Sequence, residues 1–436
     1  MSSTGTYAPA SGLQASATGN LLVAAVILVL FILSSIVSAE RKDVTQGFDE
    51  VAHVSYVAHI QHSGDFWPAL TSMRMLDPTD FHFTHELNYM AHPPIFYDLQ
   101  AVLGPQLEGH PQAVVAHRLI DVGLAAIGLA AFLGLGLAAH FSRYQFYAYA
   151  VPIACIPVLA PIAGSVSNDN LALLGGGLAT LGAYQLLATG RGNWLALALA
   201  GVIAAGWAKL TGLILVGGMS GGVIAYMVWR QRMRWSWAAA AALAFALAAA
   251  PYIFDVIRYG SPVPTTPGFL AFVQNELRDL GWGALPRRSF PSYFAWYVGQ
   301  FFASWMPTLA ARSAFQYAML AIPAAALACA AAGLVLSLRR VWARQETALD
   351  IIVICGALAF PVNFALQIGY TYHFYAATGW LSGPYLRFYA VLAAVVPLAG
   401  LSLLDAIKEP RWRGALLTFL IAGPILFELL GAPLAV

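Results

Sequence analysis

Residues 46–68 read QGFDEVAHVSYVAHIQHSGDFWP and residues 85–99 read HELNYMAHPPIFYDL; both lie between the first and second long apolar segments of the chain. Eight of the ten histidines fall between positions 53 and 117, and eleven of the twenty acidic residues fall between positions 40 and 121. Nearly all of the remaining sequence is apolar. The functional polar groups of the protein are therefore expected in this first long loop.

The composition indicates a membrane protein. The chain is 60% hydrophobic and 10% charged, with a mean hydropathy of +0.70, whereas soluble proteins contain about 25% charged residues. The formal net charge of +2 is not gathered into a basic patch interleaved with aromatic residues, so we expect no nucleic-acid partner. Cys155, Cys329 and Cys355 lie in apolar segments without short spacing, which predicts neither a disulfide framework nor a zinc site.

About eleven apolar segments approach the roughly 20 residues that cross a bilayer as a helix. They are residues 20–39, 119–140, 145–163, 169–188, 194–208, 210–229, 236–257, 314–337, 348–368, 384–404 and 414–433. The sequence thus predicts an all-α polytopic membrane protein with a single membrane domain over residues 21–436. Residues 1–20 are uncharged and rich in Ser, Thr, Ala and Gly, which predicts a flexible cytoplasmic tail.

The first apolar segment has a second interpretation, a cleaved signal peptide. No basic region precedes it, and the run from residue 21 to 39 is longer than the usual apolar region of a signal peptide. An uncleaved first span is therefore the preferred interpretation.

Lysine and arginine residues predict the orientation, because short cytoplasmic loops carry an excess of them. With the N-terminus inside, the short basic loops lie inside and three larger segments lie outside, residues 40–118, 258–313 and 369–388. These outer loops are expected to form the active-site face. The short loops and the absence of organelle signals favour a bacterial inner membrane with this face in the periplasm.

Two short helices are predicted in the first outer loop, lying at the membrane interface. Residues 48–63 have apolar positions at helical spacing, which predicts an amphipathic helix parallel to the bilayer. Pro93 and Pro94 stop any incoming helix, and Pro94 is suited to open the next one. Apolar residues spaced along 95–102 predict the second helix.

Asp49 and Glu50 lie about ten residues after the first span. A carboxylate that is partly desolvated at the membrane edge has a raised pKa and becomes a better general base. The pair therefore suits deprotonation of an acceptor hydroxyl. The alternative is an acidic turn or a helix N-terminus, where acidic residues are common for electrostatic reasons.

Four features together resemble the GT-C superfamily of polytopic glycosyltransferases. They are the Asp49-Glu50 pair, HPPIFYDL from residue 92, SNDN at residues 167–170 and GPYLRFY at residues 383–389. This superfamily uses polyprenyl-phosphate sugars and includes protein O-mannosyltransferases and the aminoarabinose transferases of lipid A. The resemblance implies a GT-C-like fold and an inverting transfer with Asp49 as the base.

The same resemblance implies roles for further residues. Glu50 corresponds to the acidic neighbour of the base, and HPPIFYDL places His92 and Tyr97 near the substrate pocket. The chain lacks the WWDYG signature of oligosaccharyltransferases, so transfer to a protein sequon is not favoured and the acceptor stays open.

A polyprenyl-phosphate donor needs cations near the membrane surface, because arginine binds phosphate through paired hydrogen bonds. The candidates are Lys209, Arg258, Arg287, Arg288 and Arg387. For Arg258, ordinary anchoring at the end of a span is the preferred explanation. Lys209 lies between apolar runs, where a charge costs roughly 2.5 to 3.5 kcal/mol at mid-membrane, so we expect it at an edge or paired inside the bundle. The alternative for Arg287 and Arg288 is simple exposure to water.

The predicted substrate pocket is completed by polar and aromatic residues of the outer face, namely His53, Asp169, Tyr372 and His373. Asp169 has a turn-forming role as its alternative, and an interfacial aromatic belt explains Tyr372 equally well. A divalent metal is an open alternative, with His53 and Asp49 as its pair, since residues four apart share a helix face. No fixed metal-ligand spacing such as HExxH occurs.

Three functional hypotheses follow. The first is a membrane glycosyltransferase that moves a sugar from a polyprenyl phosphate to an acceptor hydroxyl of a glycolipid, polysaccharide or protein. The second is a transporter or flippase of a lipid-linked saccharide, which predicts ionisable residues along a path across the membrane. The third is a scaffold subunit of a polysaccharide assembly complex.

Overall fold

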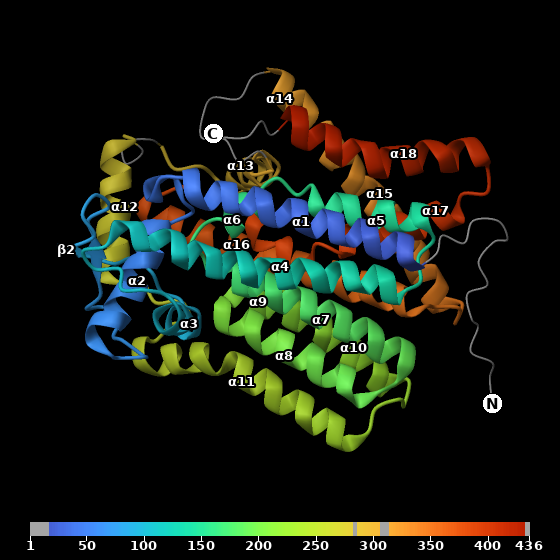
Figure 1. Cartoon of the computed structure of the whole chain (residues 1–436), viewed down its shortest axis with the longest axis horizontal. Helices are drawn as coiled ribbons and strands as arrows, with labels where there is room; N and C mark the ends of the chain where they lie inside the picture. The colour runs from blue at the N-terminus through green and yellow to red at the C-terminus, as the bar shows by residue number, and fades with distance from the viewer. Residues whose placement is uncertain (1–16, 282–285, 306–313, 432–436) are drawn as a thin grey trace.

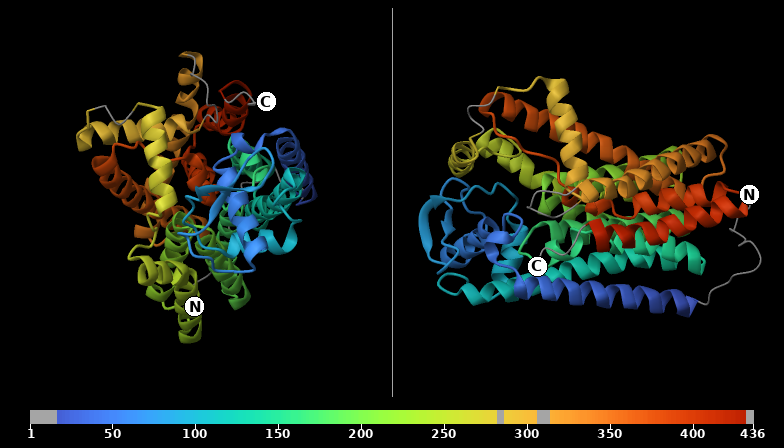
Figure 2. Two further views of the ribbon diagram at one scale, coloured as in Figure 1. Left: turned by 90° about the vertical axis from the view of Figure 1, so that its left-hand side faces the viewer. Right: turned by 90° about the horizontal axis from the view of Figure 1, so that it is seen from above.

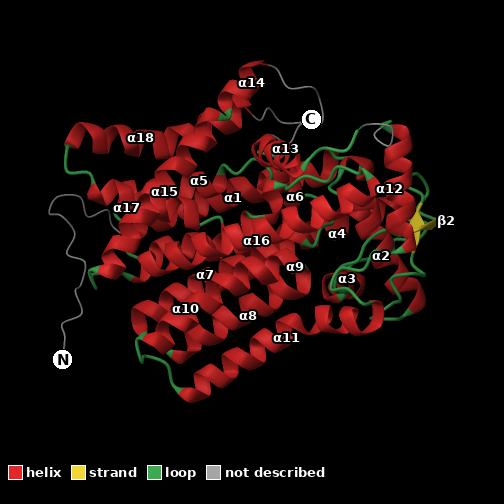
Figure 3. Ribbon diagram, turned by 180° about the vertical axis from the view of Figure 1, so that it is seen from behind, coloured by secondary structure: helices red, strands yellow, loops and turns green. Residues whose placement is uncertain are grey.

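The computed structural model describes residues 17–281, 286–305 and 314–431. Most of this part is helical, as Figure 3 shows. Eight of its helices are long and apolar enough to cross a membrane. Large apolar side chains are exposed along them, for example Leu22 and Leu30, as expected for surfaces that face lipid. The protein is an α-helical polytopic membrane protein, which confirms the predicted fold class.

The bundle is built from helices of unequal length. The helices in the eight candidate spans are α1 (Ala17–Arg41), α4 (Val114–Ala138), α7 (Asp169–Thr189), α9 with α10 (Leu210–Gly212, Gly218–Trp229), α11 (Trp235–Tyr259), α14 with α15 (Ala314–Met319, Ala321–Trp342), α16 (Ala348–Thr378) and α18 (Pro410–Leu426). Shorter helices of the bundle are α5 (Arg143–Ala154), α6 (Leu159–Ala163), α8 (Gly192–Ala208) and α17 (Val395–Ala406).

The predicted count of about eleven spans is not confirmed. The segment expected over 145–163 is divided into α5 and α6, with Pro152 inside α5. Proline removes a backbone donor and its ring clashes with the preceding turn, so this apolar run bends instead of continuing. Helix α8 has 17 residues, and the segment over 384–404 begins with two short 3₁₀ turns before α17.

Helix α7 lies at the centre of the bundle, packed tightly between α4 and α8. A Cβ added to Gly177 would lie 2.3 Å from the Gly128 carbonyl oxygen on α4, and one added to Gly201 on α8 would lie 2.4 Å from the Ala179 backbone nitrogen. Small residues allow helix backbones to approach this closely in membranes. These contacts fix the position of the N-terminal end of α7, which begins at Asp169.

The first and second outer loops gather at one end of the elongated bundle (Figure 1). There α2 (Glu50–Ser63), α3 (Ile95–Leu103) and α12 (Pro267–Asp279) lie beside a two-stranded antiparallel hairpin of β1 (Arg74–Leu76) and β2 (Phe83–Leu87). Figure 2 shows this lobe from its free side and from above, beyond the ends of the long helices. The hairpin was not expected, because the strands are short and lie in a proline-interrupted polar segment.

Helices α2 and α3 occupy the positions predicted for the two interfacial helices. Helix α3 follows Pro94 directly and exposes Val102 and Leu103, which suits an interfacial position. Helix α2 differs from the expectation of an amphipathic surface helix, because most of its residues are buried. The hairpin and α3 cover it, which holds its polar side chains within the protein.

The third outer loop connects the end of α16 to α17. It joins the second loop, where Tyr293 on α13 (Phe290–Ala303) donates a hydrogen bond to the Ser382 carbonyl. It joins the first loop through Arg387 and Asp49. The three outer loops are therefore in mutual contact at one end of the molecule.

Candidate active site

Asp49 lies in the turn between α1 and α2, immediately before the first residue of α2. Its backbone is left-handed, with φ of 61°, a conformation that costs energy for a residue with a side chain and is concentrated at functional sites. The Asp49 carboxylate accepts a 2.8 Å hydrogen bond from Arg387 and a 3.3 Å hydrogen bond from the Tyr89 hydroxyl. Burial raises the pKa of Asp49, but the charge and hydrogen bond of Arg387 outweigh burial and hold that pKa below its usual value.

Arg387 connects Asp49 to a second carboxylate. It lies in the 3₁₀ turn Leu386–Phe388, and its side chain is only 11% exposed. Its Nε lies 3.8 Å from Asp169 Oδ2. The guanidinium lies over the rings of Phe48, Tyr385 and Phe388, at 5.2 to 5.3 Å from their centroids, and aromatic faces of this kind stabilise a cation.

Lys209 forms a buried ion pair with Asp169. It interrupts the helix between α8 and α9 in an extended conformation, and the Asn168 side chain binds the neighbouring Ala208 carbonyl at 2.8 Å. The Lys209 ammonium also lies 4.5 Å from the centroid of the Phe388 ring. The expectation that Lys209 is paired inside the bundle therefore holds, and the partner is another candidate residue.

His53, His92 and Tyr97 form a buried cluster of rings near Asp49. The rings of His53 and His92 are stacked at a centroid distance of 6.2 Å, and His53 Nδ1 is 2.9 Å from the Tyr97 hydroxyl. Burial lowers the pKa of His53 to about 3 and that of His92 to about 4. Both imidazoles are therefore neutral near pH 7 and serve as hydrogen-bonding groups without charge.

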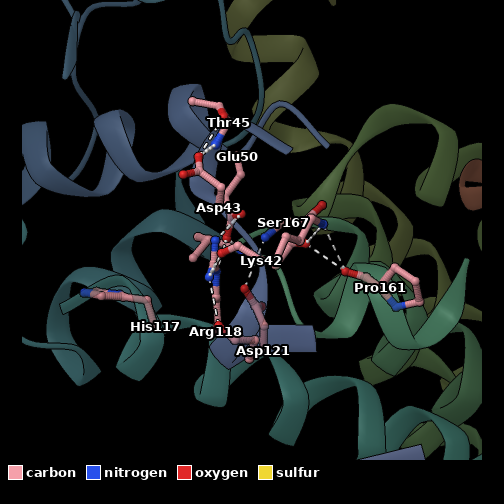
Figure 4. A network of polar contacts seen from close by, with 12 residues as sticks. Lys42, Asp43, Thr45, Glu50, His117, Arg118, Asp121, Pro161 and Ser167 are labelled. Atoms are coloured by element: carbon pink, nitrogen blue, oxygen red, sulfur yellow. Dashed lines mark hydrogen bonds and ion pairs between the residues drawn. The ribbon is translucent and has the colours of Figure 1, made fainter. Parts of the chain in front are cut away.

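Glu50 has different partners from Asp49, although the two residues are adjacent. Figure 4 shows its carboxylate beside the Arg118 guanidinium, with both oxygens accepting 2.8 Å hydrogen bonds from it. Glu50 Oε1 also accepts a hydrogen bond from the Val166 backbone nitrogen at 2.7 Å. The Glu50 side chain is fully buried. Its contacts are those of a residue that stabilises the fold, although the sequence predicted a catalytic role for it.

Four predicted residues lie around α13 and the end of α16. Arg287 donates a hydrogen bond to the Thr378 carbonyl, and the Arg288 backbone nitrogen donates one to the Tyr375 hydroxyl. Tyr372 packs on Phe290 and Tyr293, and His373 is exposed. No contact described for these four reaches Asp49, Asp169, Lys209 or Arg387.

Sequence analysis missed several residues that complete the site. Tyr89 binds Asp49, and Phe48 and Phe388 flank Arg387. In the sequence, the only indication of their roles is that they lie next to or near the motifs that contain Asp49, His92 and Arg387. Arg118 had a better signal, because an arginine at the start of an apolar segment needs a partner.

The described residues do not converge as a metal site. Among residues 17–281, 286–305 and 314–431, no group of three or more His, Cys, Asp and Glu side chains is arranged to hold a metal ion. Within the predicted pair, His53 Nδ1 contacts Tyr97 and Asp49 is bound by Arg387.

The site thus defines a helical membrane protein with two paired carboxylates and two cations at one end of its bundle. No protein-family model matches the sequence, and no curated protein matches it. Among solved structures, the chain is similar to ArnT from Cupriavidus metallidurans in the apo state, with 17% identity and a TM-score of 0.47. It is also similar to the same protein bound to undecaprenyl phosphate, with 16% identity and a TM-score of 0.44. Each match covers 92% of this chain and 62% of that chain.

Proposed function

We propose that this protein is a membrane glycosyltransferase that moves a sugar from a polyprenyl-phosphate donor to an acceptor hydroxyl on the non-cytoplasmic side of the bacterial inner membrane. The observation that carries the proposal is the contact of Asp49 with Arg387, beside the Asp169–Lys209 pair, at the loop end of an apolar bundle. The sequence resemblance described above points to the same chemistry.

In this proposal the donor phosphate binds Arg387 and Lys209. Both cations lie at the end of the bundle, which is where a phosphate attached to a membrane-embedded polyprenyl chain is positioned. Arg387 has donor capacity to spare, because its buried Nε forms no hydrogen bond within the described part of the chain. Guanidinium groups bind phosphate through two parallel hydrogen bonds. A phosphate that binds Nε and Nη2 uses the Nη2 group that now binds Asp49, so the donor competes with Asp49 for Arg387.

Donor binding would also activate the base. Arg387 holds the pKa of Asp49 low, whereas burial alone raises it. A phosphate that takes over the Arg387 hydrogen bonds removes the stabilisation of the Asp49 carboxylate and raises its proton affinity. Asp49 then becomes a competent base only when the donor is bound, so it does not remove the proton of an acceptor when no sugar is available for transfer.

The proposed transfer assigns one role to each of these groups. Asp49 accepts the proton of the acceptor hydroxyl while that oxygen attacks the anomeric carbon from the face opposite the leaving phosphate, and the sugar–phosphate bond breaks. Arg387 and Lys209 stabilise the negative charge that develops on the polyprenyl phosphate. Tyr89, His53 and His92 are neutral hydrogen-bonding groups near Asp49 and would orient the acceptor.

A donor panel tests the proposal. The protein in nanodiscs is given polyprenyl phosphates that carry different labelled sugars, with a panel of glycolipid and saccharide acceptors. The proposal expects at least one donor to lose its sugar to an acceptor and to release polyprenyl phosphate in equal amount. If lipid-linked sugars are moved across a vesicle membrane intact and none is consumed, the transporter hypothesis replaces it.

A further inference from the structure

We infer that the buried ion pair of Glu50 and Arg118 is a positioning clamp. It holds the turn that carries Asp49 in a fixed position relative to the segment that carries Asp169. The inference rests on the proposed function, since it assigns these two residues to the same site. It also revises the expected role of Glu50, because a positioning residue acts through its neighbours and does not touch substrate.

Arg118 is the centre of the clamp. It lies near the start of α4 and is 1% exposed. Its Nε and Nη2 bind the two oxygens of Glu50, and its Nη1 binds the carbonyl oxygens of Ala39 and Lys42, all at 2.8 Å. One side chain therefore joins the end of α1, the start of α2 and α4.

Glu50 transmits this anchoring to Asp49. The side chain of Glu50 folds back over the turn, since a Cβ added to Gly47 would lie 2.5 Å from Glu50 Oε2. Asp49 lies in this turn between Gly47 and Glu50, and its backbone is left-handed with φ of 61°. A strained conformation persists when the surrounding structure over-determines it, and here the clamp supplies that constraint.

Glu50 also reaches the second carboxylate, through the segment that precedes α7. Its Oε1 accepts the hydrogen bond from the Val166 backbone nitrogen. The next residue, Ser167, is fixed by Asp121 at 3.1 Å, and its hydroxyl lies 3.3 Å from Asp169 Oδ2. A single buried carboxylate thus holds the turn that carries Asp49 and the segment that leads to Asp169.

The contacts of Glu50 favour positioning over direct catalysis. Its side chain is fully buried, and both of its oxygens already accept charge-assisted hydrogen bonds. A general base must reach the proton that it removes. The Glu50 side chain is 0% exposed and cannot reach an acceptor hydroxyl, whereas the Asp49 side chain is 38% exposed.

A matched control is available elsewhere in the bundle. Asp350 is fully buried and binds Arg340 at 2.8 Å, together with Ser337 and Thr347. This ion pair joins the end of α15 to the start of α16 and shares no residue with the candidate site. Asp350→Asn leaves Arg340, whose side chain is 29% exposed, without its carboxylate partner, and Glu50→Gln leaves the buried Arg118 without its own. Both changes are expected to cost stability, and Glu50→Gln is expected to cost more.

The experiment compares Glu50→Gln with Asp350→Asn in the full-length protein in nanodiscs. Thermal unfolding is measured first, and turnover is then measured well below both transitions. We expect Glu50→Gln to lower kcat about 100-fold, the loss typical of a displacement of about 1 Å at a reacting group, with little change in the KM for donor. Asp350→Asn should keep kcat within about twofold of wild type. Equal effects of the two changes on kcat would overturn the inference.

A double variant keeps the test valid if Glu50→Gln folds poorly. Replacing both partners, as Glu50→Gln with Arg118→Met, leaves no unpaired buried charge, and such replacements are often neutral for stability. We expect the double variant to regain thermal stability while kcat stays low, because the Arg118 bonds to Ala39 and Lys42 are lost. Recovery of kcat together with stability would show that the pair serves folding only.

A measurement without turnover separates this inference from the proposed function. Hydrogen exchange is followed in the peptide that spans residues 164–170. The clamp predicts faster exchange there in Glu50→Gln than in Asp350→Asn, since the Val166 amide loses its charged acceptor. Unchanged exchange would overturn the clamp even if the enzyme is active. If wild type consumes no donor but exchange responds as expected, the proposed function fails and the clamp stands.

Discussion

Replacing Arg387 by glutamine tests the central electrostatic contact of the site. The change removes the 2.8 Å hydrogen bond to Asp49 and the positive charge between Asp49 and Asp169. A hydrogen bond to a charged group contributes about 1.5 to 3 kcal/mol. Because Asp49 is 38% exposed, solvent screening places the value at the low end. At 1.36 kcal/mol per pKa unit, the pKa of Asp49 should rise by about one unit.

The assay is the pH dependence of donor consumption. The acid limb of kcat/KM reports the pKa of the free enzyme's base, and the acid limb of kcat reports the pKa of the base in the complex with substrate. In wild type, kcat/KM should have the more acidic limb, because donor binding takes Arg387 away from Asp49. In Arg387→Gln the kcat/KM limb should move up by about one pH unit, and kcat/KM should fall about 100- to 1000-fold through loss of charge stabilisation.

The matched control is Arg258→Gln. Arg258 also lies over two aromatic rings, those of Phe254 and Tyr259, and it belongs to the same end of the molecule without contacting Asp49. Its replacement should leave both limbs in place. The reasoning is refuted if the acid limb of Arg387→Gln coincides with that of wild type, or if Arg258→Gln moves it equally.

Three further predictions concern buried charge. Lys209→Met should cost stability, because within the described part of the chain it leaves Asp169 with only the more distant Arg387 guanidinium and the Ser167 hydroxyl. The cost should be at the low end of the roughly 3 to 5 kcal/mol for a broken buried pair. Lys209→Met with Asp169→Asn should regain stability without donor consumption, and recovered turnover would contradict the phosphate role. Because the pKa of His53 is lowered in the folded protein, only the unfolded chain takes up a proton at this residue just below pH 6.5. The free energy of unfolding should therefore fall on acidification by up to about 1.4 kcal/mol per pH unit. In denaturant titrations at a series of pH values, His53→Gln should show a smaller slope of this free energy against pH. Burial raises the pKa of Asp98 to about 7, so the folded state disfavours the ionised carboxylate at any pH above its ordinary pKa of 3.8. Asp98→Asn should therefore raise the melting temperature most at pH 8, less at pH 5 and little at about pH 3.5. Equal effects at pH 8 and pH 3.5 would contradict this.

Composition and local chemistry predicted much of the molecule. A chain this apolar has few alternatives to membrane helices, and the prolines before residue 95 determine where α3 begins. The cost of burying one charge predicted that Lys209 lies at a membrane edge or is paired inside the bundle, and in the structure it is paired with Asp169. These inferences depended on single residues or on contiguous segments, which is the information that a sequence displays directly.

What depends on long-range pairing was not predictable. Glu50 and Arg118 are 68 positions apart, and no periodicity relates them, so Glu50 was expected to act beside Asp49. The number of spans was uncertain because α5, α8 and α17 are short and their ends depend on packing. The hairpin of β1 and β2 depends on its contact with buried α2 and carries no alternating apolar pattern of its own.

The most direct test of the account compares Asp49→Asn with Asp43→Asn in sugar transfer from the productive donor. Asp43 lies in the same turn, is exposed, and caps Thr45 through a side-chain oxygen that asparagine retains. The account predicts that Asp49→Asn binds donor, stays folded and loses transfer by about 100- to 10,000-fold, the contribution typical of a general base, while Asp43→Asn transfers sugar at the wild-type rate. Wild-type transfer by Asp49→Asn would contradict the account.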